Sequence, residues 1–108
     1  MSRTDAQRKM DILEAAEDLA RLAERGRAAF DEDLAVSLAM ERLLEVFGEA
    51  SSHLSEEFRN SFPSVDWRAI IDMRIVLAHM YHRVDRNLIW MMATTSVPDL
   101  VAILSEPR

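Results

Sequence analysis

The chain has 108 residues, of which 49% are apolar and 30% charged, which is typical of one folded globular domain rather than a disordered segment. Its net charge of −6 argues against tight, non-specific binding to nucleic acid. It contains no cysteine, which excludes disulfides, thiolate metal sites and a cysteine nucleophile. Residues 1–25 carry charges throughout and no run of about 18 apolar residues occurs, so we expect no signal peptide, no membrane span and a cytoplasmic location.

Only two glycines and three prolines are present, which favours long helices with few turns. The first helix is predicted to start at Thr4, which forms a capping box with Gln7, and to end near Gly26, although residues 27–30 could extend the turn. A second helix is predicted from about residues 31–33. Its apolar stripe has helical spacing and comprises Met40, Leu43, Phe47, Ala50, Leu54 and Phe58. Gly48 lies within this helix, where either a close helix crossing or chance would explain it.

Pro63 marks the clearest break in the chain. Ser64 or Asp66 can cap a third helix, from Trp67 to about Met80, and a short loop follows at residues 81–84. Asp85 can cap a fourth helix at 86–93, and residues 94–96 are predicted to end it. Pro98 suits the first turn of a last helix at 99–104. We therefore predict a single all-α domain over residues 1–108, an antiparallel bundle of four main helices with a short C-terminal helix.

Positive charge is concentrated in one segment. Residues 68–86 carry four arginines and two aspartates, a net charge of +2 inside an acidic chain. A local basic region of this kind can hold one phosphate or a few, although on charge alone a solvated basic surface is the favoured interpretation.

Arg74 and His79 form an R-x4-H pattern within this segment. Arginine offers a fork of donors that fits phosphate oxygens, and histidine can give or take a proton near neutral pH. These abilities suit metal-free RNA cleavage, which needs a base, an acid and a cation over the phosphorane. On a straight helix, however, five residues turn the two side chains about 140° apart. The pair therefore converges only if the helix ends or bends near Ala78, or if a second subunit completes the site.

Each candidate also has a structural interpretation. Arg74 and His79 can be a helix-end arginine and a histidine packed at a turn. Tyr81, seven residues after Arg74, can be an interfacial aromatic with its hydroxyl in water. His82 and Arg83 are further candidate contacts to RNA or surface residues.

The second predicted helix carries Glu41, Glu45 and Glu49 at intervals of four. They could form a carboxylate row for a metal, but no Glu-x-x-His pair accompanies them. A solvated acidic edge is the favoured interpretation, and neither a metal nor a cofactor is predicted. His53 is expected to be a partly buried structural histidine.

The chain from residue 42 onward resembles the HepT-like family of the HEPN superfamily. The matching stretches are LLEVFGEAS (43–51), LSEEFRNSFPSVDWRAIIDMR (54–74), the R-x4-H-x-Y motif of Arg74, His79 and Tyr81, then Val84-Asp85 and Trp90. Several matching elements in the same order are far more specific than R-x4-H alone.

The resemblance implies an all-helical toxin of a toxin–antitoxin pair, acting as a metal-independent endoribonuclease. It implies a homodimer in which Arg74 contacts the scissile phosphate and His79 acts as general acid or base, in a cleft between subunits. It also implies a nucleotidyltransferase-fold antitoxin that attaches AMP to Tyr81 and silences the toxin.

Three positions depart from the family pattern. Ile75 stands where a polar residue, commonly Asn, follows the motif arginine, Asp72 replaces a common Gly, and Arg42 replaces a neutral polar residue. Ile75 removes a hydrogen-bonding group that could orient the site. An alternative function is therefore a non-catalytic subunit that binds a nucleotide or docks a nucleotidyltransferase, and a third is a plain dimeric scaffold.

Overall fold

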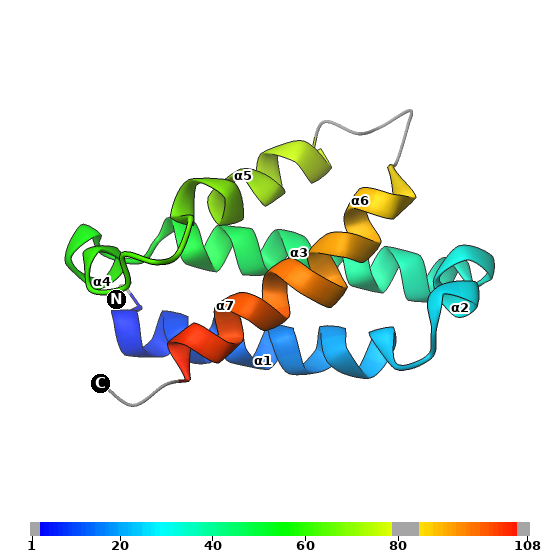
Figure 1. Cartoon of the computed structure of the whole chain (residues 1–108), viewed down its shortest axis with the longest axis horizontal. Helices are drawn as coiled ribbons and strands as arrows, with labels where there is room; N and C mark the ends of the chain where they lie inside the picture. Colours follow the sequence, from blue (N-terminus) through cyan, green and yellow to red (C-terminus); the bar gives the residue numbers. More distant parts are fainter. Residues whose placement is uncertain (1–2, 79–84, 106–108) are drawn as a thin grey trace.

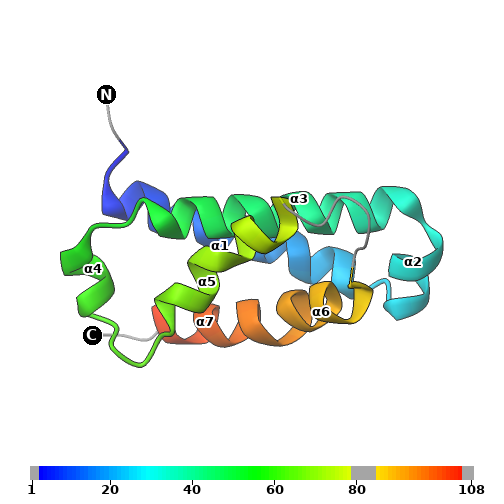
Figure 2. The ribbon, with the colours of Figure 1, turned by 90° about the horizontal axis from the view of Figure 1, so that it is seen from above.

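The computed structural model describes residues 3–78 and 85–105, and all regular secondary structure within these ranges is helical. In chain order the elements are α1 (Asp5–Ala23), α2 (Arg27–Glu32), α3 (Leu34–Ser52), α4 (Glu56–Asn60), α5 (Trp67–Ala78), α6 (Arg86–Met91), the π-helical segment η1 (Met92–Ser96) and α7 (Val97–Leu104). Figure 1 shows α1 and α3 antiparallel along the long axis, with α5 on the other side of α3. The run from α6 to α7 crosses one face of the bundle, as Figure 2 shows from above. The predicted all-α bundle is confirmed.

Helix α3 is the centre of the bundle, because it packs against both α1 and α5. Its inward side chains include Met40, Leu44 and Phe47, which are fully buried. Helix α1 adds Ile12 and Leu19 to the same core, also without exposed surface. The opposite side of α3 carries polar and charged residues, so one helix supplies both the core and the floor of an outer surface.

Several predicted caps are confirmed. The Thr4 hydroxyl accepts from the Gln7 amide at 3.1 Å while the Gln7 side chain accepts from the Thr4 amide at 2.8 Å, completing the capping box of α1. Asp66, rather than Ser64, accepts from the Ala69 amide at 3.1 Å at the start of α5. Asp85 accepts from the Leu88 amide at 3.0 Å at the start of α6. Local sequence therefore decides where these helices begin.

The prediction of one continuous second helix up to Phe58 is wrong. Helix α3 ends at Ser52, and Ser55 starts the separate helix α4 by accepting from the Phe58 amide at 3.1 Å. Asp5, fifty residues earlier, accepts from the Ser55 amide at 2.9 Å and from its hydroxyl at 2.6 Å. Because this amide is bonded to Asp5, it is not available to continue α3.

Two more boundaries differ from the predictions. Residues 27–32 form a helix of their own, α2, after Gly26 takes a φ of 92°, a conformation that favours glycine. Residues 94–96 do not end the fourth helix but belong to η1, which joins α6 to α7. The Thr94 hydroxyl donates to the Trp90 carbonyl at 2.7 Å, so a residue expected to break the helix bonds back into it.

The joined run Arg86–Leu104 is, by length and composition alone, the one helix in the described ranges that could cross a membrane. Six of its side chains are buried in the bundle core, namely Ile89, Met92, Ala93, Val97, Leu100 and Leu104. These residues recur at helical spacing, so one face of the run packs against the rest of the domain.

Gly48 permits the close approach of α3 and α5. A Cβ atom at this position would lie 3.1 Å from the Arg74 amide nitrogen and 3.2 Å from both the Arg74 Cβ and the Ile70 carbonyl oxygen. The helix-crossing explanation of this glycine is therefore confirmed. The crossing fixes where the backbone of Arg74 lies along α3.

We expect Gly48→Ala to destabilise the fold. Alanine improves helix propensity by about 1 kcal/mol, but overpacking against a helix backbone typically costs about 1–3 kcal/mol. The free energy of unfolding should therefore fall by up to about 2 kcal/mol, which lowers the urea midpoint. A midpoint above that of the wild type would show that α5 moves away freely, which would contradict a tight crossing.

Candidate functional site

Arg74 is the motif residue that the structure describes, and it lies on α5 beside the Gly48 crossing. Its backbone packs on α3 while its side chain, 41% exposed, reaches the outer surface. Its Nη1 lies 3.4 Å from a carboxylate oxygen of Glu49. Its Nε is buried and has no hydrogen-bond partner within the described ranges. The Nη groups of Arg74 therefore reach the surface of the bundle, while its Nε stays inside without a partner.

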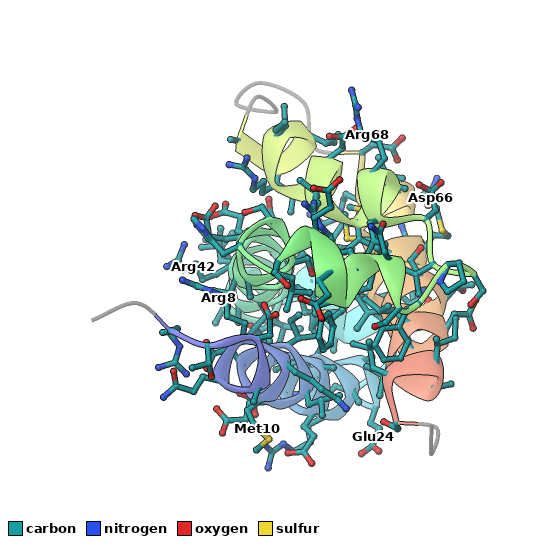
Figure 3. The ribbon with its side chains drawn as sticks, turned by 90° about the vertical axis from the view of Figure 1, so that its left-hand side faces the viewer. Arg8, Met10, Glu24, Arg42, Asp66 and Arg68 are labelled. Atoms are coloured by element: carbon teal, nitrogen blue, oxygen red, sulfur yellow. The ribbon has the colours of Figure 1, made fainter. Side chains whose placement is uncertain are left out.

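The surface around Arg74 is a hollow of about 690 Å³ between α1, α3 and α5, which we call the groove. Its apolar lining comprises Ala15, Leu43, Val46, Ala50, Ile75 and Ala78. Its cations are Arg8, Arg42 and Arg74, and its acids are Asp11, Glu14, Asp18, Glu45 and Glu49. Figure 3 looks along the bundle and shows Arg8 and Arg42 on the side away from the red C-terminal helix. The groove thus opens on the face that α6 and α7 leave uncovered.

Glu49 is the central acid of this groove. Its carboxylate lies 2.8 Å from the His53 Nε2 as well as near Arg74. The hydrogen bond with His53 is the main reason that the pKa of Glu49 is lowered. Burial raises this pKa by less than that hydrogen bond lowers it, and the charges of Arg74, His53 and Arg8 lower it further. One carboxylate therefore links the motif arginine to a histidine and a second arginine.

The three glutamates of α3 do not act as a row. Glu45 pairs with Arg42 at 3.2 Å, and burial raises the pKa of Glu41. No cluster of three histidine, cysteine, aspartate or glutamate side chains in the described part of the chain could hold a metal. Glu49 is 55% exposed at its side chain, in agreement with a solvated edge, although it also contacts Arg74 and His53. The His53 side chain is 50% exposed rather than packed. The i,i+4 spacing of Glu49 and His53 was the signal that could have identified the pair.

The three departures from the family pattern have clear positions. Ile75 lines the groove and is 45% exposed. Asp72 pairs with Arg68 at 3.4 Å, one turn away on α5, as expected for an exposed charge or salt-bridge partner. Arg42 is 72% exposed at its side chain. Of the three, Ile75 and Arg42 contribute directly to the groove.

The other motif residues, His79, Tyr81, His82 and Arg83, lie outside the described residues, as does the predicted loop at 81–84. On one side of them, Ala78 lines the groove as the last residue of α5. On the other side, Arg86 at the start of α6 donates to the Phe30 carbonyl and lies 2.9 Å from an Asp31 carboxylate oxygen. Arg86 also stacks 4.6 Å from the centre of the Phe30 ring, so α6 is anchored on α2. Whether Arg74 and His79 converge stays a prediction.

Comparison with known proteins gives consistent matches. A family profile described as ribonuclease HepT-like matches residues 12–106. A protein of Methanocaldococcus jannaschii named as a putative RNase is 33% identical over 91 residues, 83% of this chain and 84% of its own length. A protein of Thermococcus cleftensis named "Probable ribonuclease HepT" is 34% identical over 68 residues, 63% of this chain and 62% of its own. No solved structure matches this chain significantly.

The contacts of Glu49 predict how its pKa responds to substitution. Both His53→Gln and Arg74→Met should raise the Glu49 pKa, because each removes a group that favours the carboxylate. The pKa of Glu49 in the folded protein lies below its ordinary value of 4.5, so the ionised carboxylate stabilises the fold above pH 4.5. This stabilisation is lost as the pH falls through the lowered pKa of the folded protein.

Carbon-13 NMR titration of the Glu49 carboxyl measures these shifts. Arg42→Met is the matched control, because Arg42 pairs with Glu45 and should leave the Glu49 midpoint unchanged. A Glu49 midpoint that stays the same in both His53→Gln and Arg74→Met would refute the three-residue arrangement.

Proposed function

The chain belongs to the HepT-like ribonuclease family, and from this premise we propose that it is a metal-independent endoribonuclease toxin that acts as a homodimer. The observation that carries the proposal is the motif arginine, held at the edge of an open groove with donors left unused. A nucleotidyltransferase-fold antitoxin is the proposed partner that keeps the toxin inactive.

Arg74 is proposed to bind the scissile phosphate. A guanidinium stays charged at all relevant pH values and presents parallel donors that match two phosphate oxygens. Glu49, 3.4 Å away, orients the guanidinium without enclosing it, since the Arg74 side chain remains 41% exposed. The arginine is thus suited to stabilising the extra negative charge of a phosphorane.

His79 is proposed as the general acid or base. The ribose 2′-oxygen attacks phosphorus while a base takes its proton, and the bond to the 5′-oxygen breaks as an acid protonates the leaving oxygen. The products are a 2′,3′-cyclic phosphate and a free 5′-hydroxyl. No oxidation and no metal is required, and a histidine is able to perform either proton transfer near neutral pH.

The spacing of the motif supports the proposed homodimer. Helix α5 continues to Ala78, so Arg74 lies within a regular helix five residues before His79. A cleft shared by two subunits lets both groups face one substrate without converging inside one subunit. His82 and Arg83 are proposed as additional contacts to RNA in this cleft. The groove supports this idea because it is open and lined by both apolar and charged side chains.

RNA cleavage by the purified chain tests the catalytic proposal. Arg74→Ala and His79→Ala should each reduce the rate by at least about 100-fold, with chelator present throughout. Arg68→Ala is the matched control on the same helix, because Arg68 is 88% exposed and pairs only with Asp72 in the described part of the chain. Equal cleavage by all the variants would remove Arg74 and His79 from the chemistry.

Tyr81 is proposed as the site at which the antitoxin attaches AMP. The hydroxyl oxygen of Tyr81 would attack the α-phosphate of ATP and release pyrophosphate, placing a bulky, negative group beside the RNA-binding segment. Co-expression of the partner nucleotidyltransferase should relieve growth inhibition by the wild type but not by Tyr81→Phe. Equal relief of both, with no mass increase on Tyr81, would contradict silencing by modification.

A second candidate function is a non-catalytic subunit that binds a nucleotide or docks a nucleotidyltransferase. Ile75 favours it, because an apolar side chain lines the groove where the family commonly has a polar one. Under this alternative, ATP would bind while RNA stayed intact, and His79→Ala would not change growth inhibition.

A further inference from the structure

Arg8 is a second arginine with unused donors in the groove. It lies on α1, across the groove from Arg74 on α5. Within the described residues, the Nε atoms of Arg8 and Arg74 are the buried side-chain polar atoms without a hydrogen-bond partner. These two Nε atoms are shielded from solvent, but the Nη groups of Arg8 are not buried and have no hydrogen-bond partner among the described residues, so they can take an acceptor from outside the chain.

Arg8 and Arg74 act on the same carboxylate. Arg8, Arg74 and Glu49 all line the groove, the Arg74 guanidinium lies 3.4 Å from the Glu49 carboxylate, and the charges of both guanidiniums lower the pKa of Glu49. Glu49 also has the His53 ring at 2.8 Å. Two guanidiniums therefore share one carboxylate at this end of the groove, which leaves it with net positive charge. A phosphate oxygen has the charge and the acceptors that such a site favours.

The other charges in the groove compensate one another. Asp11 pairs with Arg3 at 2.7 Å, and Glu45 pairs with Arg42 at 3.2 Å. Asp18 pairs with Arg21. Arg8, by contrast, has no hydrogen bond or ion pair from its side chain to any described residue. The attraction for an anion is thus concentrated at the end of the groove that Arg8 and Arg74 line. Glu14 is the lining acid that has no ion pair among the described residues.

We propose that Arg8 is a second phosphate-binding residue, which holds a phosphate of the RNA next to the one that Arg74 engages. This proposal rests on the proposed ribonuclease function and extends it to α1, outside the motif segment. Arg8 binds substrate and takes no part in proton transfer. Its loss should therefore raise the Kd and the KM for RNA while kcat changes little, whereas loss of Arg74 lowers kcat.

Binding of a short single-stranded 2′-O-methyl RNA tests the proposal, because this probe cannot be cleaved by transesterification. Arg8→Ala should raise its Kd by about tenfold and reduce the slope of log K against log salt by about 0.7. Arg8→Lys keeps the charge, so the salt slope should stay at the wild-type value even though the forked donors are lost. Lys9→Ala is the matched control, because this substitution removes the same charge from the next residue of α1, and Lys9 does not line the groove.

Equal Kd values and salt slopes for Arg8→Ala and Lys9→Ala would overturn the proposal. Circular dichroism checks that Arg8→Ala is folded; if it is not, Arg8→Gln, which removes the charge but keeps most of the side chain, replaces it and should reduce the salt slope in the same way. Cleavage of ordinary RNA by the wild type and by Arg74→Ala is measured on the same samples. If cleavage depends on Arg74 while Arg8→Ala binds RNA like the control, the proposal for Arg8 fails and the ribonuclease proposal stands. If the wild type does not cleave, the ribonuclease proposal fails, and the binding contrast still decides the role of Arg8.

Discussion

The site depends on the close crossing of α3 and α5 at Gly48. The absence of a Cβ at Gly48 leaves room for the backbone of Arg74, whose amide nitrogen would lie only 3.1 Å from such an atom. One residue further along α3, Glu49 then meets the guanidinium of Arg74. The contact that packs the two helices therefore also positions the motif arginine, so the core and the groove cannot vary independently of each other.

An acidic chain can carry an anion-binding groove because charge acts locally. At physiological salt, exposed charges more than about 8 Å apart are largely screened. Most groove acids are paired with arginines, while Glu49 is surrounded by Arg8, Arg74 and His53. The net charge of the protein therefore says little about the potential that a phosphate meets at this end of the groove. The net negative charge does weaken the binding of RNA to the rest of the surface, which would favour RNA that enters the groove over RNA that contacts the surface at random.

The misplaced end of the second predicted helix has a cause that is not local. The capping box at Thr4 and the caps at Asp66 and Asp85 depend on residues three positions apart, so the sequence alone predicts them. The end of α3 depends on Asp5, which bonds to Ser55 from fifty residues away. No local pattern contains that contact. Likewise, Glu49 looks like any exposed glutamate until the fold brings α5 alongside it, even though its helical spacing to His53 was visible.

The sequence by itself determined that this chain is a helical bundle of the HepT-like family, and it identified Arg74 as the residue to examine. Apolar periodicity, helix caps and an ordered series of motifs involve residues that are close in sequence or follow one another in a fixed order, so they can be recognised without a structure. Only the tertiary structure decided that Gly48 lets α5 lie on α3, that Glu49 meets Arg74, and that Arg8 on α1 shares their groove. Those relations join residues 25 to 66 positions apart, and they exist only because packing of the core places three helices side by side.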